Sequence, residues 1–387
     1  MLLLYLPCPP MKKRIAIITP QIDSPTESFI QCHIEFLEGD KLVYHGADIP
    51  NKLNGNGLYK PPGFASRAVR KIQNRLKKET LQPKTKAFQD SLIAEKPDAI
   101  LIEYGHIAAQ VIDIIQPTGI PIIVHFHGYD SAQYELLARY QKEYKRVFAY
   151  ASRIVAVSNA MRERLISLGA PADKVVYSCY GPHPDFALQR GEFAPSKQLL
   201  AIGRFVDKKS PHLTLFAFSK VLQEYPDAKL VMIGEGTLLP MCKDLVQFLN
   251  MENNVEFTGA LKRQAIIDNM KNSLAFVQHS RTAEDGDKEG TPVAVIESQL
   301  FGLPVVATKH EGIADIVLHN ETGFLVDEGD WMLMSEYMKK ILSDFELARA
   351  MSSKARKRIE SGFLLSHHID TLNNLIDDVI RQRNPKV

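Results

Sequence analysis

The sequence predicts an α/β protein made of two doubly wound parallel-sheet domains that face each other across a cleft. The first observation is length, because 387 residues exceed what one hydrophobic core usually organises. The second is pattern: short apolar runs bounded by turn residues alternate with helical periodicity, as in parallel βα units. The third is a Gly-Pro-His-Pro break at 181–184, after which a second series of runs begins near Gln198.

The predicted strands are apolar runs rich in β-branched residues. They lack a polar alternation, so we expect helices on both faces of each sheet. In such sheets, ligands bind beyond the carboxyl ends of the strands. The runs are Arg14–Thr19, Ala99–Tyr104, Pro121–Phe126, Arg153–Ser158, Val175–Cys179, Leu199–Gly203, Lys229–Gly234, Val255–Thr258, Ala275–Gln278, Pro304–Ala307 and Phe324–Val326.

These patterns place the first domain at residues 11–190 and the second at 195–365. We expect residues 366–387 to form a helix that crosses back to the first domain. Residues 1–10 lack a basic n-region, and their apolar run is shorter than a signal peptide needs. We therefore expect Met11 to be the natural start, with a weak membrane-touching tail as the alternative.

Composition excludes several classes of function. Hydrophobic residues make up 45% and charged residues 24%, as in a soluble globular protein, and no apolar run is long enough to span a membrane. A net charge of +2 gives no electrostatic reason to bind nucleic acid. The four cysteines are scattered without Cys-x-x-Cys pairing, which favours a reducing, cytoplasmic location and argues against a zinc site.

A cationic pocket is predicted at the start of the second domain. Gly203 and Arg204 end a predicted strand, and Lys208 and Lys209 precede the helix that Ser210 begins. A guanidinium at a strand end, with ammonium groups at the next helix start, suits a diphosphate. The alternative is surface lysine and arginine near a turn.

The segment from Glu289 to Glu297 predicts a helix that binds an anion at its start. Pro292 suits the first helical position and Thr291 the N-cap, so Glu289 lies in the loop ahead, facing free N–H groups. The helix is nearly all apolar, so Glu297 should be buried and require a hydrogen-bond partner, for which vicinal ribose hydroxyls are suited. The alternative is a partly exposed Glu297 paired with a lysine.

These motifs resemble those of glycosyltransferase family 4, the large retaining family of GT-B fold, whose two domains are Rossmann-like. The pair of glutamates with seven residues between them, and Gly-Arg…Lys-Lys upstream, carry the resemblance. The match is strongest over residues 195–330. Four more segments are similar to sequence motifs of the family and occur in the same order: 233–236, 255–259, 302–308 and 320–324.

The resemblance implies a nucleotide-sugar donor site in the second domain and an acceptor site in the first. Glu289 would face the donor sugar, Glu297 would hold the ribose, and Arg204 and Lys209 would stabilise the leaving diphosphate. Lys208, next to Lys209, is less suitable for this contact with the diphosphate. Because two cations and the start of a helix can stabilise the charge on the leaving diphosphate, we expect no metal ion to be needed. The residues expected to bind the donor are Glu297, Gly203, Gly290, Thr291, Pro292, Val293 and Gly234.

In the first domain, the resemblance singles out His127 as a catalytic-site residue, with His125 packing behind it. His-Gly-x-Asp follows the strand at 121–124, where an imidazole can bond a hydroxyl or phosphate. Glu103-Tyr104-Gly105 stands where similar exopolysaccharide and lipopolysaccharide transferases often have His-Phe-Gly. Ser158 is expected to cap the next helix. In the second domain, Asp315 replaces a glutamate of the family pattern.

The segment Lys60–Lys86 contains nine basic residues and one acidic residue over an apolar helical stripe. It predicts either peripheral contact with an anionic membrane at its inner face or an ordinary solvated surface.

Together these features predict a retaining glycosyltransferase that uses a UDP- or GDP-sugar and a sugar or lipid-linked acceptor in surface polysaccharide or glycolipid synthesis. The alternatives are a nucleotide-sugar epimerase or phosphorylase of similar fold, or a non-catalytic nucleotide-sugar-binding protein.

Overall fold

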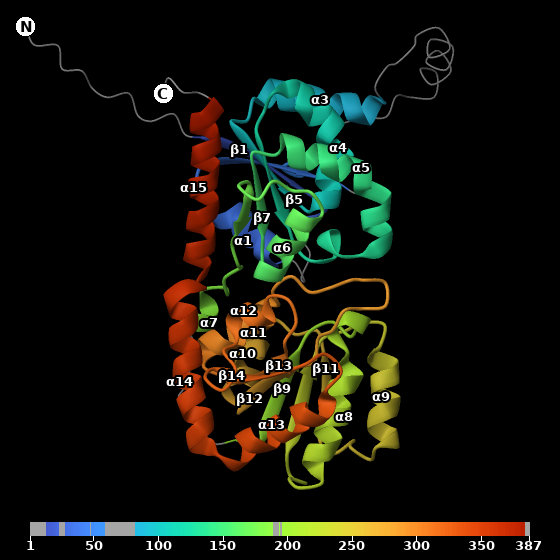
Figure 1. The fold of residues 1–387 in the computed structure, drawn as a ribbon, viewed down its shortest axis with the longest axis vertical. Helices are drawn as coiled ribbons and strands as arrows, with labels where there is room; N and C mark the ends of the chain where they lie inside the picture. The colour runs from blue at the N-terminus through green and yellow to red at the C-terminus, as the bar shows by residue number, and fades with distance from the viewer. Residues whose placement is uncertain are drawn as a thin grey trace, which may run out of the picture.

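The computed structural model describes residues 13–22, 28–46, 48–58, 82–188, 193 and 196–383, which form two α/β domains (Figure 1). Each domain has one β-sheet covered by helices, which confirms the predicted fold class. Every strand predicted from the sequence is present within two residues of its predicted bounds. Residues 1–10 and residues 60–81 of the basic segment lie outside the described residues.

The first domain contains an eight-stranded sheet in the order β4-β3-β2-β1-β5-β6-β7-β8. It is parallel except for β3 and β4, which pair antiparallel at one edge. The sequence missed β2, β3 and β4, since β2 has polar ends and the other two span two residues each. The strands are β1 (Arg14–Thr19), β2 (Asp40–His45), β3 (Lys52–Leu53), β4 (Asn56–Gly57), β5 (Ala99–Glu103), β6 (Ile122–Phe126), β7 (Arg153–Ala156) and β8 (Val175–Tyr177).

Alternate residues of these strands pack on opposite faces of the sheet. In β1, Ile18 faces the core formed with α3, α4 and α5, whereas Ile17 belongs to the cluster on the other face. This two-residue period fixes the register of each buried strand. The helices are α1 (Ser28–Phe36), α3 (Pro83–Glu95), α4 (Gly105–Ile115), η1 (Gln116–Thr118), η2 (Tyr129–Ser131), α5 (Tyr134–Tyr150), α6 (Asn159–Ser167) and α7 (Asp185–Leu188).

The second domain contains a six-stranded parallel sheet in the order β11-β10-β9-β12-β13-β14. The chain therefore reverses its direction of winding between β9 and β12. A crevice forms at the carboxyl ends of the strands on either side of such a switch point. The strands are β9 (Gln198–Ile202), β10 (Lys229–Ile233), β11 (Val255–Gly259), β12 (Ala275–Gln278), β13 (Val305–Thr308) and β14 (Gly323–Val326).

Helices cover both faces of this second sheet. Leu199 and Leu230 pack with α8, α9 and α13, while Leu200 and Val231 face the side that α10 and α11 cover. The helices are η3 (Asp207–Lys209), α8 (Pro211–Leu222), α9 (Leu239–Phe248), α10 (Arg263–Lys271), α11 (Val293–Phe301), α12 (Ile313–Ile316), α13 (Trp331–Ser343) and α14 (Phe345–Gly362).

The last helix, α15 (Leu365–Arg383), packs on the first domain although it follows the second in sequence (Figure 1). Its apolar residues contact β1 and β5, and Asp377 accepts a hydrogen bond from Lys13 at 2.7 Å. The chain passes close to itself where α15 begins. A Cβ at Gly181 would lie 2.0 Å from the Leu365 nitrogen, so only glycine fits there.

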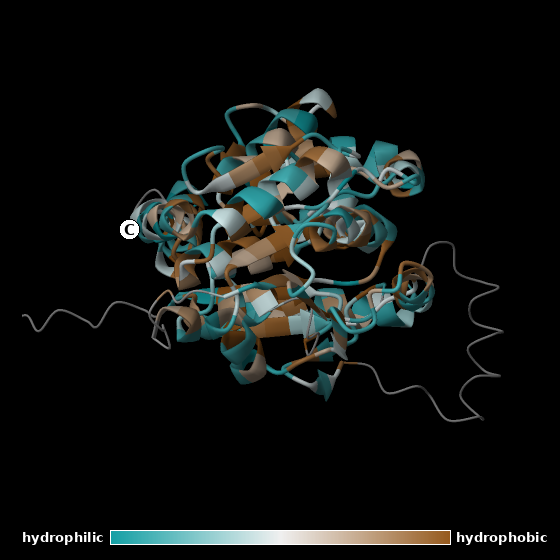
Figure 2. Cartoon of the chain, turned by 90° about the horizontal axis from the view of Figure 1, so that it is seen from below, coloured by the Kyte–Doolittle hydropathy of each residue, from teal (hydrophilic) through white to brown (hydrophobic). Residues whose placement is uncertain are grey.

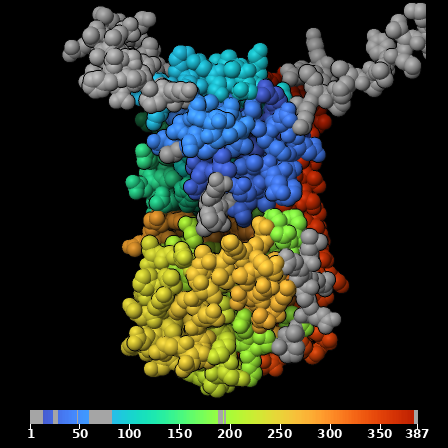
Figure 3. All heavy atoms as spheres, turned by 180° about the vertical axis from the view of Figure 1, so that it is seen from behind, coloured from blue at the N-terminus to red at the C-terminus, as the bar shows by residue number. Residues whose placement is uncertain are grey.

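The apolar strands lie inside the helical layers, as the hydropathy colouring shows (Figure 2). In space-filling view the blue first domain and the yellow second domain are distinct lobes, with the red C-terminal helices along one side (Figure 3). Among the described residues, no helix is both long enough and apolar enough to cross a bilayer.

Candidate active site

The predicted cationic pocket lies at the switch point of the second sheet. β9 ends at Ile202, and the chain continues through Gly203 and Arg204 into η3, which contains Lys209. Lys209 Nζ lies 3.2 Å from Glu289 Oε2, so the two predicted segments meet. Burial lowers the pKa of Lys209, and Glu289 opposes this effect only in part.

Glu289 is 7% exposed and its two carboxylate oxygens differ. Oε2 pairs with Lys209, whereas Oε1 is buried and has no hydrogen-bond partner among the described residues. Burial acts to raise the pKa of Glu289, but Lys209, then Lys208 and His310, outweigh it and hold this pKa below its usual value. The site therefore contains a charged carboxylate with a vacant acceptor oxygen.

The loop that carries Glu289 is held by a histidine that the sequence did not single out. His310 Nε2 accepts from the Glu289 backbone N–H at 3.3 Å, and His310 Nδ1 lies 2.6 Å from Glu328 Oε1. The only local signal was its position two residues after β13, at the carboxyl edge of the sheet. We identify His310 as the residue that fixes the backbone beside Glu289.

The start of α11 differs from the prediction in one detail. Pro292 occupies the N-cap position with non-helical backbone angles, and no side chain caps the helix. Thr291 is therefore not the N-cap; its hydroxyl donates instead to the Val157 carbonyl of the first domain at 2.5 Å. The sequence pattern cannot show a partner 134 positions away, which is why it favoured the local cap. Val293 is the first residue of the helix.

Glu297 lies within α11, where it is half-buried and forms no hydrogen bond with the described residues. Burial raises its pKa to about 7, and the charge of Arg263 only partly opposes the shift. The lysine partner of the alternative is not among the charges that act on Glu297. A carboxyl group in this state has a free acceptor for a ligand hydroxyl.

Gly234, at the end of β10, allows two strand ends to approach each other. Its φ is +140°, and an added Cβ would lie 2.0 Å from the Gly203 carbonyl oxygen. Any other residue would force these strand ends apart. An added Cβ at Gly203 would in turn meet the Lys209 side chain at 3.3 Å. Both predicted glycines thus shape the floor beneath Lys209.

The two neighbouring lysines have different surroundings. Lys208 Nζ lies 3.0 Å from Asp287 Oδ1 and donates to the Lys288 carbonyl at 3.2 Å, so Lys208 supports the loop. Asp287 belongs to an Asp-x-Asp sequence with Asp285, which the expectation of a metal-free site overlooked. Asp285 accepts from the Asp287 backbone N–H at 2.9 Å and from the Gln133 side chain of the first domain at 3.1 Å, so both carboxylates already have partners.

Arg204 is exposed, and no described residue forms an ion pair or hydrogen bond with its side chain. It is therefore available to an anionic ligand beside Lys209 without first breaking an ion pair.

In the first domain, His127 follows β6 and is buried. Its Nε2 lies 2.9 Å from Glu103 Oε2, and its Nδ1 is hydrogen-bonded to the Tyr180 hydroxyl. Burial, followed by the neighbouring His125, lowers the pKa of His127 to about 3, so its ring is neutral. Both ring nitrogens therefore contact the first domain itself, and the ring of Phe29 stacks on the imidazole at 4.6 Å.

The backbone of His127 meets the loop of the second domain that carries Glu289. A Cβ added at Gly290 would lie 2.2 Å from the His127 carbonyl oxygen, and one added at Gly128 would lie 2.8 Å from the Lys288 carbonyl oxygen. These two glycines let the loops touch. His127 of the first domain and Gly290, next to Glu289 in the second, thus meet at one place.

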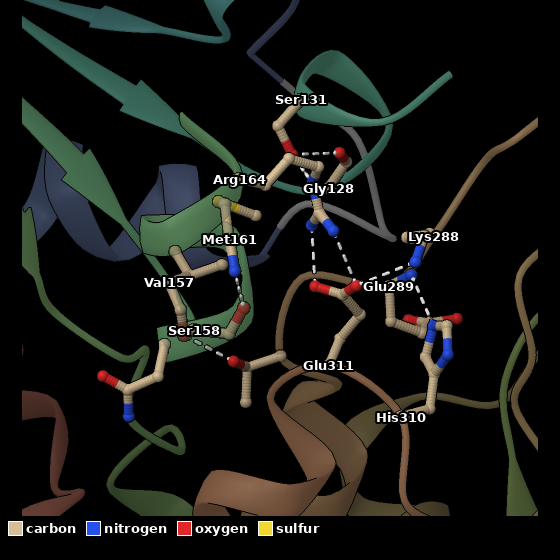
Figure 4. Close-up of polar contacts among 12 residues, drawn as sticks. Gly128, Ser131, Val157, Ser158, Met161, Arg164, Lys288, Glu289, His310 and Glu311 are labelled. Atoms are coloured by element: carbon tan, nitrogen blue, oxygen red, sulfur yellow. Dashed lines mark hydrogen bonds and ion pairs between the residues drawn. The ribbon is translucent and has the colours of Figure 1, made fainter. Parts of the chain in front are cut away.

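Ion pairs join the two domains around this contact (Figure 4). Arg164 on α6 forms two hydrogen bonds with Glu311, at 2.8 and 2.7 Å, and Lys288 lies 3.4 Å from the same carboxylate. Asp315, which stands where the family pattern has a glutamate, accepts hydrogen bonds from the backbone and the side chain of Asn159 at 2.8 and 3.1 Å. Its role is therefore an interdomain contact. Ser158 caps α6 as predicted, accepting from Met161 at 3.1 Å.

Several known proteins are similar to this chain. It is 27% identical over 273 residues to the amylovoran biosynthesis glycosyltransferase AmsK of Erwinia amylovora, covering 69% of this chain and 66% of the relative. It is 28% identical over 242 residues to the putative colanic acid biosynthesis glycosyltransferase WcaL of Escherichia coli K12, covering 62% and 59%. The matches thus span less than two thirds of these relatives.

Solved structures share the fold along nearly the whole chain. Anabaena HepE in complex with UDP superimposes with a TM-score of 0.71 at 18% identity, covering 96% of this chain and 100% of that one. A glycosyltransferase from Rickettsia africae also gives 0.71, at 16% identity, with 96% and 99% covered. The two-domain arrangement is the GT-B fold.

Family models match each half of the sequence. Residues 15–181 match the glycosyl transferase 4-like domain, and residues 186–358 match the glycosyl transferases group 1 domain. The two matches together include most of the described residues and both sheets. The chain therefore consists of a glycosyl transferase 4-like domain followed by a glycosyl transferases group 1 domain.

Proposed function

We propose that this protein is a retaining glycosyltransferase that moves a sugar from a nucleoside diphosphate sugar to an acceptor hydroxyl. The observation that carries the proposal is the buried Oε1 of Glu289, which lacks a hydrogen-bond partner among the described residues. A buried acceptor without a donor is costly, and a sugar hydroxyl donating to it would remove that cost. Lys209 beside it keeps the carboxylate charged.

The diphosphate of the donor would bind next to this carboxylate. Arg204 is free to form a bidentate contact with a phosphate, and Lys209 supplies a second cation. The N–H groups at the start of α11 add a partial positive charge. Glu297, half-buried with a free carboxyl group, would accept from the ribose hydroxyls. These charges would stabilise the leaving phosphate without a metal ion.

Retention would follow from attack on the face from which the diphosphate leaves. The bond between the anomeric carbon and the phosphate oxygen breaks, and the acceptor oxygen bonds to the same carbon. The acceptor proton passes to the departing phosphate oxygen. Arg204 and Lys209 would interact most strongly with the negative charge that develops on the leaving phosphate. Catalysis requires interactions that are stronger in the transition state than in the ground state. His127, in the first domain, would contact the donor through its backbone. Its ring could also contact the donor if one ring nitrogen exchanged its hydrogen bond to Tyr180 or Glu103 for one to the donor.

The relatives support this proposal in chemical class. Solved HepE structures contain UDP, UDP-glucose, or UDP with glucose, and the AmsK and WcaL names refer to exopolysaccharide synthesis. We propose a UDP- or GDP-sugar as donor and a sugar or lipid-linked acceptor in surface polysaccharide or glycolipid synthesis. The protein would act in the cytoplasm at the membrane face, with the basic segment Lys60–Lys86 as the contact.

Two measurements test this function. A thermal-shift screen with UDP, GDP, ADP and dTDP should identify one nucleotide that raises the melting temperature. The matching nucleotide sugars should then release that nucleoside diphosphate, and the product should carry the anomeric configuration of the donor. Absence of any nucleotide effect would contradict the donor site, and an inverted product would contradict retention.

A further inference from the structure

Three buried imidazoles meet in the first domain, behind the candidate active site. His33 comes from α1, His125 from β6 and His368 from α15, and each is at most 2% exposed. One nitrogen from each ring lies within 4.8 Å of the others. The three residues therefore join elements that are far apart in the sequence, including the helix that crosses back from the second domain.

The orientation of two of these rings is fixed from outside the group. His33 Nδ1 lies 2.7 Å from Glu103 Oε1, and His368 Nδ1 lies 2.7 Å from Ser178 Oγ. Both rings consequently turn Nε2 inward, and the two Nε2 atoms lie 2.9 Å apart. A ring held through one nitrogen by a carboxylate or hydroxyl, with the other nitrogen pointing at a common centre, is the arrangement that surrounds histidine ligands of metal ions.

The third imidazole provides an independent observation. Neither ring nitrogen of His125 has a hydrogen-bond partner among the described residues, although the residue is 0% exposed. Its Nδ1 lies 3.4 Å from Glu103 Oε2, which is close but does not form a hydrogen bond. A direct hydrogen bond between His33 and His368 accounts for those two rings, but both ring nitrogens of His125 stay without a hydrogen bond to any described residue. A cation bound by all three would satisfy it as well.

We propose that His33, His125 and His368 bind one divalent transition-metal ion. Imidazole nitrogen is a preferred ligand of Zn²⁺, and three histidines are a known protein ligand set for zinc. Glu103 and Ser178 hold two of the ligating rings from behind. The scattered cysteines exclude a thiolate site but do not bear on a site made of histidines.

The ion would fasten α15 to the core of the first domain. It would bind α1 and β6 on one side and α15 on the other, so its binding energy would add to the apolar packing of α15 on β1 and β5. This role is separate from the donor site and does not depend on the proposed transferase activity.

The first test is the metal content of the full chain purified without a histidine tag. After incubation with ZnCl₂ and gel filtration, we expect about one zinc per chain and a melting temperature that falls when a chelator removes it. X-ray absorption on the same sample should show about three imidazole nitrogens at roughly 2.0 Å from zinc. A chain that retains no metal and shows no change in melting temperature would overturn the proposal, leaving a hydrogen-bonded histidine pair.

Variants locate the ion. His33→Ala and His368→Ala should each lose the bound zinc, whereas His367→Ala, an exposed neighbour on α15, should retain it. Retention of zinc by both cluster variants would contradict the assignment. Should these variants fail to fold, the absorption spectrum of the unaltered protein still decides, because a coordination shell of sulfur or of oxygen alone would exclude the three histidines.

Discussion

Lys209 Nζ lies 3.2 Å from one oxygen of Glu289, while the other oxygen of the same carboxylate is buried without a partner among the described residues. Lys209 in η3 and Glu289 in the loop before α11 are 80 positions apart in the sequence and meet at the switch point of the second sheet. Under the proposed function, the pair would offer a cation to a phosphate and an acceptor to a sugar hydroxyl.

Replacing Glu289 by Gln should lower turnover by about two orders of magnitude, the size of effect expected for loss of one transition-state contact. The amide keeps the shape but removes the charge that Lys209 and the sugar require. Nucleotide affinity should change little, because the diphosphate contacts remain. Steady-state kinetics and calorimetry measure the two effects separately. Glu284→Gln, in the same loop but exposed, is the matched control and should behave as the unaltered protein.

Replacing Glu297 by Gln should weaken nucleotide binding but stabilise the free protein at neutral pH. The pKa of Glu297 is raised to about 7, so the folded state holds a proton that the unfolded state releases near pH 4.3. Stability of the unaltered protein is therefore lost as the pH rises from about 4.3 to 7. The variant escapes this loss, so its melting-temperature advantage should grow over that window and then stay constant. An advantage independent of pH would contradict the burial of this carboxyl group.

The fold and the donor-site motifs could be predicted because their signals are local. The buried strands are continuous apolar runs, and Glu289 and Glu297 lie in one short segment. The contacts that organise the site are not local. His33 meets His368 across 335 positions, and Thr291 bonds Val157 across 134, so no periodicity could indicate either pair. The N-cap prediction for Thr291 was wrong for this reason.

Arg164 should be important for the contact between the domains. Its bidentate pair with Glu311 is largely buried, and Glu311 would keep only Lys288 if Arg164 were removed. Arg164→Ala should therefore lower the free energy of unfolding by roughly 2–5 kcal/mol. Chemical denaturation measures this, with Arg162→Ala as the control, since its pair with Glu163 is exposed and should contribute under about 1 kcal/mol. Equal losses in both variants would show that the interdomain pair has no special role.

Charge reversal of Arg67, Arg70, Lys71 and Arg75 should reduce binding to anionic vesicles. Basic residues outnumber acidic residues nine to one over Lys60–Lys86, and each basic residue is worth about 1 kcal/mol near an anionic surface. Nucleotide binding should be unaffected, since the residues proposed to bind the nucleotide belong to the second domain. Vesicle flotation measures the effect; if the reversed protein floats with anionic vesicles as well as the unaltered one, this segment does not bind membranes.

The central claim is that Arg204 and Lys209 bind the diphosphate of the donor, and calorimetric titration tests it most directly. The nucleoside diphosphate identified by the thermal-shift screen is titrated into the unaltered protein, Arg204→Ala and Lys209→Ala, with the corresponding nucleoside as a ligand control. Lys243→Ala, an exposed lysine on α9, is the protein control. Each site variant should bind the diphosphate at least about tenfold more weakly, the effect of one lost charge-assisted hydrogen bond, and bind the nucleoside unchanged. Equal diphosphate affinity in all four proteins would contradict the account.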